Sequence, residues 1–329
     1  MRILVIGGTR FLGRRLVEVA LERNHDVTLF NRGKTNADLF LSVPKLRGDR
    51  HSDVSALQGK TWDVVIDTCG YVPRVVSASA QAVARSTALY IFISSISVYA
   101  DFSNPNINES SPVATMPDET LEDVTNETYG ALKALCEQAA ESAMPGRVLH
   151  IRPGYIVGPY DPTDRFTYWP FRIAQSGEVA APGKSESPVQ FIDVRDLTEW
   201  LIRMSEQAKA GTYNATGPDY MLTMQRFLET CKGATRSDAR LTWLSESFIF
   251  ERNLEADFPI WTPTGERGGS MVDCAKAIAD GLTFRPLEDT IQATIAWNEA
   301  RPEGFTERAG ISREREVALL EEWRSTLQK

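Results

Sequence analysis

The first thirteen residues constrain the fold of this chain more than any other stretch of its sequence. Ile3 to Ile6 form a short apolar run that predicts a buried strand, and a glycine turn follows at Gly7 and Gly8. Apolar residues then recur at the spacing of a helix, at Phe11, Leu12, Leu16, Val17, Ala20 and Leu21. At such a junction, unpaired backbone N–H groups and the helix dipole bind a pyrophosphate. The sequence therefore predicts an α/β fold with a doubly wound parallel sheet that binds a dinucleotide.

The glycine pattern of this turn departs from the commoner dinucleotide-binding form. Gly7 and Gly13 frame it, Gly8 lies inside it, and Arg10 stands where the commoner form has its middle glycine. A glycine turn in an unrelated α/β domain is the alternative interpretation, because short motifs also match by chance. On the dinucleotide interpretation, the residues of this turn expected to contact the cofactor are Gly7, Thr9, Arg10, Phe11, Leu12 and Gly13.

Composition excludes several other classes of protein. At 329 residues the chain can form one large domain or two smaller ones. Its net charge of −8, without a basic block, argues against nucleic acid as the main partner. The 4 cysteines and 3 histidines are scattered, so we expect reduced thiols in a cytoplasmic protein and no metal site. No apolar stretch reaches membrane-spanning length, and the first apolar run is too short for a secretory signal.

The second predicted strand, Asp26 to Phe30, bears on the choice of cofactor. In dinucleotide folds an acidic residue after this strand holds the ribose hydroxyls, whereas an arginine there accommodates a 2′-phosphate. Here Asn31 and Arg32 follow the strand, with Lys34 and Arg10 as further cations. The pattern therefore favours NADP over NAD, and a solvated basic turn is the alternative.

The next two predicted strands end in further candidate cofactor residues. A short strand over 45–48 leads to Asp49 and Arg50, and the Asp49 carboxylate is suited to the adenine amino group. Asp53 is expected to cap the helix that comes next. A strand over 63–67 runs into Thr68, Cys69 and Gly70, where a glycine allows close approach of the cofactor. Pro73 then fits the first turn of a helix that reaches to about residue 85.

The fifth predicted strand, over 89–93, delivers Ser95 at its carboxyl end, where ligands of open α/β sheets bind. A polar loop over 100–126 follows, and a helix is expected to begin near Glu127. Tyr129 and Lys133 lie four residues apart on that helix, which places them on one face, about 6 Å apart. An ammonium group beside a tyrosine favours the phenolate, so this pair predicts a general acid/base, with Ser95 orienting the substrate oxygen.

These residues together carry a resemblance to a known family. The Gly7 to Gly13 turn, the Ser95, Tyr129 and Lys133 set, and the stretch R-P-G-Y-I-V-G-P over 152–159 resemble the extended short-chain dehydrogenases/reductases of the NAD(P)-dependent epimerase/dehydratase group. The resemblance covers about the first 220 residues. The G-G-T-R-F-L-G form of the turn resembles a subgroup that includes plant chloroplast stem-loop RNA-binding relatives.

The resemblance implies roles for individual residues. Ser95 would be the catalytic hydroxyl, Tyr129 the acid/base, and Lys133 the group that lowers the Tyr129 pKa and holds the nicotinamide ribose. The backbone around Pro153, Tyr155 and Ile156 would contact the carboxamide. Many nucleotide-sugar epimerases of this family have a diphosphate-binding arginine where this chain has Val189, and Arg165, Arg172 or Arg195 are the available substitutes. Family dehydratases carry an Asp-Glu pair where Ile96 and Ser97 stand, so dehydration ranks lowest.

The stretch after Pro159 is dense in aromatic residues and arginines, which suits either a ligand pocket or a core. The candidate substrate residues are Tyr71, Ser97, Arg165, Tyr168 and Trp169.

We expect a Rossmann domain over 1–155 and 190–217, and a smaller mixed α/β substrate domain over 156–189 and 218–329. Glu314 to Trp323 reads as an amphipathic helix, either a packed tail or an oligomer contact, with Ser312 as its cap.

The expected function is that of an NADP-dependent oxidoreductase or epimerase that moves hydride at a carbon bearing oxygen. Its partners would be a small, sugar-like molecule and, in a homodimer, a second copy of the chain. Whether it is a reductase or an epimerase is left open, as is NAD in place of NADP. The rival hypothesis is a nucleotide-binding or RNA-binding relative without redox turnover.

Overall fold

The computed structural model describes residues 1–302 and 309–327. Its central feature is a sheet of seven strands in the order β10-β6-β5-β4-β1-β2-β3, in which every neighbouring pair is parallel. The strands are β1 (Arg2–Ile6), β2 (Asp26–Asn31), β3 (Lys45–Arg47), β4 (Trp62–Asp67), β5 (Thr87–Ile93), β6 (Val148–Pro153) and β10 (Gly211–Ala215). The predicted doubly wound parallel sheet is therefore confirmed.

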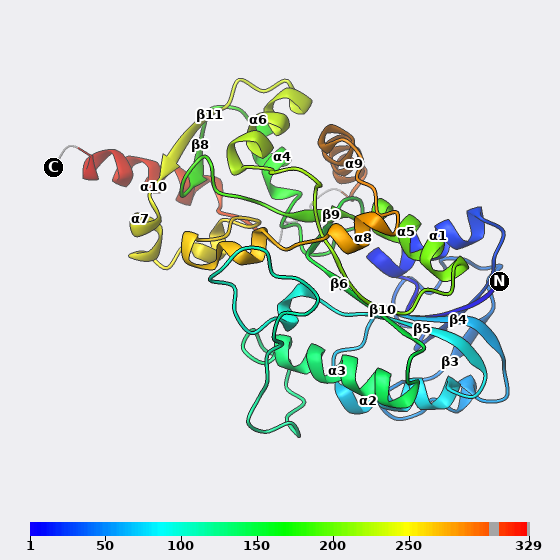
Figure 1. Ribbon diagram of the computed structural model, residues 1–329. Coiled ribbons are helices and arrows are strands. Elements are labelled where there is room, and N and C mark those ends of the chain that lie inside the picture. The colour runs from blue at the N-terminus through cyan, green and yellow to red at the C-terminus, as the bar shows by residue number, and fades with distance from the viewer. Residues whose placement is uncertain (303–308, 328–329) are drawn as a thin grey trace.

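Helices cover both faces of this sheet (Figure 1). α1 (Phe11–Glu22) and α5 (Val194–Glu206) pack on one face, and α2 (Pro73–Val83) and α3 (Tyr129–Ala143) pack on the other. Strand β1 shows why both faces are buried. Ile3 and Val5 contribute to the core beneath α1, whereas Leu4 and Ile6 contribute to the core beneath α2 and α3. Successive side chains of a strand point to opposite faces of the sheet. Because both faces are buried here, every residue from Ile3 to Ile6 must be apolar.

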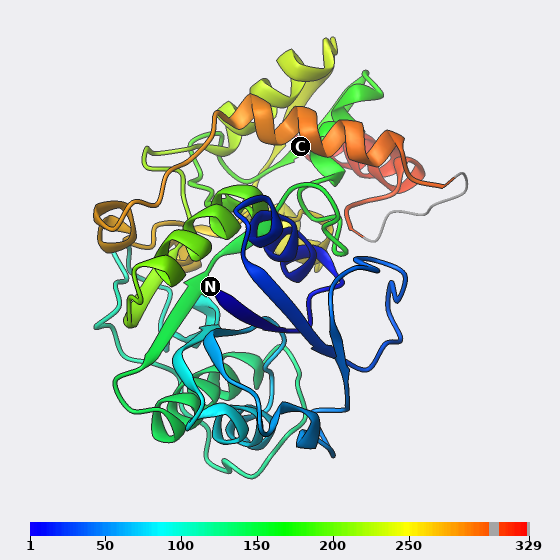
Figure 2. The same cartoon turned by 90° about the vertical axis from the view of Figure 1, so that its right-hand side faces the viewer.

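A smaller unit of mixed helices and strands forms around a separate apolar core, as predicted. Figure 2 shows α6, α9 and α10 gathered at one end of the main sheet. The elements of this part are α4 (Tyr168–Ala174), α6 (Met224–Thr235), α7 (Glu246–Phe250), α9 (Leu287–Glu299), α10 (Arg313–Thr326) and the parallel pair β8 (Glu178–Pro182) and β11 (Arg240–Leu244). A second parallel pair, β7 (Tyr155–Val157) and β9 (Phe191–Asp193), lies where the chain leaves and rejoins the main sheet.

The short helix α8 (Ala275–Ala279) comes from the C-terminal part of the chain. Ala277 and Leu282 contribute to the core of the main sheet, although they come from the C-terminal part of the chain. Within the described residues, no helix combines the length and the apolar composition needed to cross a membrane.

Two local expectations differ from the structure in detail. Asp53 does not cap a helix, because only a single 3-10 turn follows, at Ser55–Leu57, and Val54 is its N-cap residue; the Asp53 carboxylate accepts a hydrogen bond from the Ser55 backbone N–H at 2.9 Å. The helix expected near Glu127 begins two residues later, at Tyr129. The delay arises because Thr125 and Thr128 bond to each other's backbone and side chains and form a turn first.

The C-terminal helix α10 is a packed tail. Ser312 caps it by accepting a hydrogen bond from the Arg315 backbone N–H at 3.3 Å. The fully buried Glu316 carboxylate accepts hydrogen bonds from Arg172 Nε at 2.7 Å and from the Ala180 backbone N–H at 3.0 Å. Leu319 also enters the core of the smaller unit. The helix therefore ties α4 to β8 through one buried ion pair.

This ion pair yields the first prediction. Glu316→Gln leaves the Arg172 guanidinium buried without a counter-charge, so it should lower the free energy of unfolding by about 3–5 kcal/mol. Urea titration followed by tryptophan fluorescence measures the change. Glu321→Gln is the matched control, since Glu321 is exposed on the same helix, and it should change the value by less than about 0.5 kcal/mol. Equal stability of the two variants would show that the pair does not hold α10 in place.

Candidate active site

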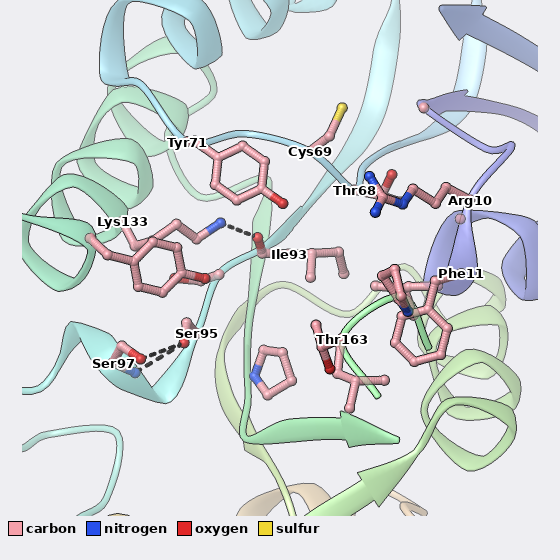
Figure 3. Close-up of a pocket in the computed structure, with 18 of the residues that line it drawn as sticks. Arg10, Phe11, Thr68, Cys69, Tyr71, Ile93, Ser95, Ser97, Lys133 and Thr163 are labelled. Carbon is pink, nitrogen blue, oxygen red and sulfur yellow. Dashed lines mark hydrogen bonds between the residues drawn. The ribbon is translucent and has the colours of Figure 1, made fainter. Parts of the chain in front are cut away.

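A cleft of about 1290 Å³ runs along the carboxyl ends of the parallel strands. Figure 3 shows part of its wall, with Arg10 and Phe11 toward one side of the view and Ser95, Ser97 and Lys133 toward the other. The cleft is lined by most residues that the sequence singled out: Gly7, Thr9, Arg10, Phe11, Leu12, Gly13, Asn31, Arg32, Asp49, Arg50, Thr68, Cys69, Tyr71, Ser95, Ser97, Tyr129, Lys133, Pro153, Tyr155, Ile156 and Arg165.

The β1–α1 turn forms one end of the cleft as a backbone cradle. Gly7 adopts a φ of 109°, which L side chains rarely adopt, and a Cβ on Gly13 would lie 2.8 Å from the Gly8 backbone nitrogen. The first turn of α1 contains no acidic residue, and no side chain among the described residues caps it. Its N–H groups therefore face the cleft, which fits the pyrophosphate of a dinucleotide.

Asn31, which replaces the usual acid after β2, stabilises this turn. Its Nδ2 donates to the Gly7 carbonyl oxygen at 3.1 Å. Its Oδ1 accepts hydrogen bonds from the Gly33 backbone N–H at 3.0 Å and from Arg47 Nη1 at 2.6 Å. The side chain thus joins β1, β2 and β3 at the edge of the cleft, and Arg47 is a nearby cation that the sequence did not single out.

Three cations surround the same edge without a counter-charge. Arg10, Arg32 and Lys34 are exposed on the cleft wall, and none of them forms an ion pair with a carboxylate in residues 1–302 or 309–327. Asp49 lines the cleft nearby and accepts a hydrogen bond from the His51 backbone N–H at 3.1 Å. This edge therefore presents a net positive field to a ligand.

Arg50 lines the cleft, and its guanidinium is also bonded to a buried carboxylate. Its Nη1 and Nη2 both donate to the buried Asp67 carboxylate at 2.6 Å. Asp67 also accepts hydrogen bonds from the Tyr90 hydroxyl at 2.9 Å and from the Cys69 backbone N–H at 3.1 Å. The Arg50 charge holds the pKa of Asp67 below its usual value although burial opposes this. Arg50 thus supports the floor of the cleft, since its guanidinium is engaged below the surface.

The segment after β4 is positioned by contacts to β1 and to α3. The Thr68 hydroxyl donates to the Ile6 carbonyl oxygen at 2.9 Å. Cys69 exposes part of its side chain to the cleft, and the Arg50 charge opposes the burial that raises its pKa. Gly70 packs against Phe92, and its carbonyl oxygen accepts a hydrogen bond from Lys133 Nζ at 2.8 Å.

Ser95 follows β5 and is nearly buried at the cleft wall. Its Oγ accepts a hydrogen bond from the Ser97 backbone N–H at 3.1 Å and donates to Ser97 Oγ at 3.0 Å (Figure 3). The short 3-10 turn Ile96–Val98 therefore orients the Ser95 hydroxyl before any ligand binds.

Helix α3 begins directly against this turn, because its second residue has no side chain. A Cβ on Gly130 would lie 2.2 Å from the Ser97 carbonyl oxygen. The preceding residue, Tyr129, is consequently beside Ser95, whose side chain lowers the pKa of the phenol. Burial is the larger effect and raises the Tyr129 pKa above its usual value. The sequence pattern gave no indication that Gly130 would set this contact.

Lys133 lies one turn further along α3, but its charge is engaged elsewhere. Its Nζ donates to the carbonyl oxygens of Gly70 at 2.8 Å and Ile93 at 2.6 Å. Burial lowers the Lys133 pKa to about 8. The expected lowering of the Tyr129 pKa by Lys133 therefore does not appear in the free protein, where Ser95 and Arg165 have that effect. Tyr71 packs beside Tyr129, with ring centroids 6.4 Å apart.

Two of the candidate substrate residues do not reach the cleft. Tyr168 and Trp169 lie in the core of the smaller unit, and Trp169 Nε1 donates to the Pro259 carbonyl oxygen at 2.7 Å. The prediction that they line the substrate pocket is wrong, because these large rings on α4 fill the interior between helices. Arg165, in the same stretch, does line the cleft.

Two loops that contain none of the candidate site residues also line the cleft. Phe102 and Asn126 line it from the 100–126 loop, and Trp261 and Glu266 line it from the C-terminal part. Backbone hydrogen bonds join these loops, with the Gly268 N–H donating to the Phe102 carbonyl oxygen at 2.9 Å. In the sequence, two features could have indicated that these loops line the cleft. They are the length of the 100–126 loop and the Pro, Gly and Trp content of the C-terminal loop.

Comparisons with known proteins agree with this architecture. The pattern of a family described as "NAD dependent epimerase/dehydratase family" matches residues 3–216. The chain resembles the solved UDP-glucuronic acid 4-epimerase of Bacillus cereus in complex with NAD, at a TM-score of 0.67 and 16% identity over 91% of this chain and 99% of that one. It also resembles the UDP-glucose 4-epimerase of Thermotoga maritima, at a TM-score of 0.67 and 15% identity over 91% and 99%. At such identities the likeness concerns the fold.

A curated relative has a different described function. The chain is 27% identical over 257 residues to the chloroplast stem-loop binding protein of 41 kDa b from Arabidopsis thaliana. The matched region covers 71% of this chain and 63% of the plant protein, so the chain spans less than two thirds of the length of that relative.

The cradle at the β1–α1 turn yields the second prediction. Gly13→Ala should weaken NADP or NAD binding about tenfold or more, because the new methyl group displaces the Gly8 backbone. Fluorescence titration with the reduced dinucleotide measures the affinity. Gly233→Ala, where no atom lies within 4 Å of the added Cβ, is the matched control and should bind as the wild type does. Unchanged affinity in Gly13→Ala would exclude the turn as the dinucleotide site.

Proposed function

The chain belongs to the NAD-dependent epimerase/dehydratase family and is an enzyme that uses a nicotinamide dinucleotide, and we propose that it is an NADP-dependent oxidoreductase of the epimerase type. Its reaction is hydride transfer at a carbon of a sugar-like substrate that carries a hydroxyl or carbonyl group. The observation that carries the proposal is the grouping of Ser95, Tyr129 and Lys133 on the wall of the cleft that begins at the glycine cradle.

The cleft residues fit a dinucleotide along its whole length. The N–H groups of the β1–α1 turn would hold the pyrophosphate, and the cleft residues that follow β4 and β6 would hold the nicotinamide half. When bound, the nicotinamide supplies a hydride acceptor and donor. The remaining chemistry, which is proton transfer and orientation of the substrate oxygen, falls to side chains of this chain.

Tyr129 is the general acid/base of the proposed reaction. Its phenolic oxygen takes the proton of the substrate hydroxyl as that oxygen becomes a carbonyl, and it returns the proton when the carbonyl is reduced. Burial raises the pKa of Tyr129 in the free protein, so the phenol stays protonated there. The oxidised nicotinamide would supply positive charge, and positive charge near Tyr129 favours the phenolate that accepts the proton.

Ser95 and Lys133 assist this proton transfer in different ways. The Ser97 backbone N–H fixes Ser95 Oγ, so the Ser95 hydroxyl is oriented to donate to the substrate oxygen when it leaves Ser97. Lys133 anchors the end of β5 to the segment after β4 through Ile93 and Gly70. Its buried ammonium also provides positive charge below the nicotinamide ribose, which is the group we propose it binds.

The cations around β2 support NADP as the cofactor. Asn31 has no negative charge with which to hold a ribose hydroxyl pair, and its carboxamide is already bonded to Gly7, Gly33 and Arg47. Arg32 and Lys34 are exposed beside it. A 2′-phosphate supplies the negative charge that these side chains lack.

RNA binding without turnover is the second candidate function, because the plant relative is described as a stem-loop binding protein. A net charge of −8 disfavours it, since the affinity for nucleic acid rests mainly on Lys and Arg contacts to phosphates. The intact Ser95, Tyr129 and Lys133 set also has no use in such a protein. We therefore favour the enzyme.

The third prediction concerns Tyr129. Tyr129→Phe should lower kcat by a factor of about 100 to 10,000, because general acid/base transfer contributes that much, while NADP affinity stays within a few-fold. Turnover is measured over a panel of nucleotide sugars and simple carbonyl compounds. Tyr220→Phe, which changes an exposed tyrosine outside the cleft, is the control and should keep full activity. Wild-type activity in Tyr129→Phe would remove the phenol from the mechanism, and salt-sensitive RNA retention without turnover would favour the second function.

The fourth prediction concerns cofactor choice. Arg32→Ala should weaken NADP binding about tenfold to a hundredfold and leave NAD binding nearly unchanged, because a charge-assisted hydrogen bond to the phosphate is lost. Affinities for both reduced cofactors are measured by fluorescence. Arg85→Ala removes an exposed arginine from the far end of α2 and should alter neither value. Equal losses for both cofactors would mean that Arg32 does not read a 2′-phosphate.

A further inference from the structure

Three arginines in the middle of the chain differ sharply in how their charge is used. Arg172 is buried and donates to the Glu316 carboxylate and to the carbonyl oxygen of Glu178. Arg195 is bonded to Asp193 through Nε at 3.0 Å and Nη2 at 2.6 Å. Both guanidinium groups therefore serve the fold. The third, Arg165, has no such partner.

Arg165 is held in place without a direct ion pair in the described residues, although its charge reaches the buried Asp161 carboxylate. Its Nε donates to Thr163 Oγ1 at 3.2 Å, and its guanidinium lies over the Tyr155 ring, 4.5 Å from the centroid. The Thr163 hydroxyl in turn donates to Asp161 Oδ1 at 2.7 Å. Within residues 1–302 and 309–327, no carboxylate forms an ion pair with Arg165, and neither of its Nη atoms donates a hydrogen bond. The guanidinium is therefore held in a fixed orientation, and its two Nη atoms donate to no residue in the described part of the chain.

Position sets Arg165 apart from the other cations of the cleft. Arg10, Arg32 and Lys34 lie at the edge near β1 and β2, and Arg50 is engaged with Asp67. Arg165 lies on the wall contributed by the 160–165 segment, where Thr163 also faces the cleft (Figure 3). It is close enough to Tyr129 for its charge to lower the pKa of that phenol. Arg165 and Tyr129 thus line the same cleft.

We propose that the substrate carries an oxyanion, a carboxylate or a phosphate, close to the reacting carbon, and that Arg165 binds it. This inference rests on the proposed function, because it concerns the substrate half of the same cleft. A planar fork of N–H donors matches both oxyanions in two-point hydrogen bonds, and the Tyr155 ring and the Thr163 hydroxyl fix the plane of that fork.

The arrangement makes Arg165 a specificity-determining residue. Because Arg165 is half-buried at the cleft wall, a neutral sugar would replace the hydrogen bonds of displaced water only with hydrogen bonds to its uncharged hydroxyl oxygens. An anionic substrate replaces them with charge-assisted bonds. The site therefore discriminates in favour of anionic substrates and against neutral sugars of the same shape.

Calorimetric titration of the NADP⁺-loaded protein tests this inference with three probes. UDP-glucose carries phosphate as its anion, D-glucuronate carries a carboxylate, and D-glucose is neutral. The variants are Arg165→Met, Arg165→Lys and, as the matched control, Arg226→Met, which removes another arginine stacked on a tyrosine, Tyr220, outside the cleft.

We expect Arg165→Met to weaken at least one anionic probe about tenfold or more, with D-glucose and NADP⁺ unaffected. Arg165→Lys should recover part of the loss, since it keeps the charge and loses the fork. Loss confined to D-glucuronate identifies a carboxylate, and loss confined to UDP-glucose identifies a phosphate. Arg226→Met should match the wild type.

Three results would overturn the inference. They are failure of the wild type to bind either anionic probe, equal binding by the wild type and Arg165→Met, and a parallel loss of D-glucose or NADP⁺ affinity. Calorimetry records binding without turnover. A protein that binds the anion through Arg165 and transfers no hydride would therefore refute the proposed function and leave this inference standing.

Discussion

The site depends on the close approach of the first turn of α3 to the end of β5. That approach exists because Gly130 meets the Ser97 carbonyl oxygen with no side chain between them. It sets Tyr129 against Ser95, and it points Lys133 at the two carbonyl oxygens that join β5 to the segment after β4. A helix displaced outward by even a methyl group would separate all three side chains from the strand ends.

Charge is distributed along the cleft in a consistent way. The edge near β2 presents uncompensated cations, the floor beneath the centre is neutralised by the Arg50–Asp67 pair, and Lys133 is buried with its pKa lowered to about 8. Arg165 then adds one oriented cation to the lining of the cleft. The cleft thus suits an elongated ligand with negative charge at one end, followed by a substrate whose own anion lies near Tyr129.

Sequence alone predicted the architecture well, because strands and helices follow local periodicity. The run Ile3 to Ile6, the glycine turn and the positions of Ser95, Tyr129 and Lys133 led directly to the parallel sheet and to a cleft at its edge. Side-chain roles that depend on distant partners were harder to predict. Arg50 became a support because its guanidinium donates to the Asp67 carboxylate of β4, which also accepts a hydrogen bond from Tyr90 of β5. Tyr168 and Trp169 became core because helices of the C-terminal part surround them, which no local pattern reveals.

The central claim is that this cleft holds a phosphorylated nicotinamide cofactor for catalysis. The most direct measurement is native mass spectrometry of the full chain, purified at moderate salt without added ligands. The account predicts a mass increment equal to NADP or NADPH that a Gly13→Ala chain lacks. Recovery of the wild-type chain free of any dinucleotide and bound to RNA would contradict it.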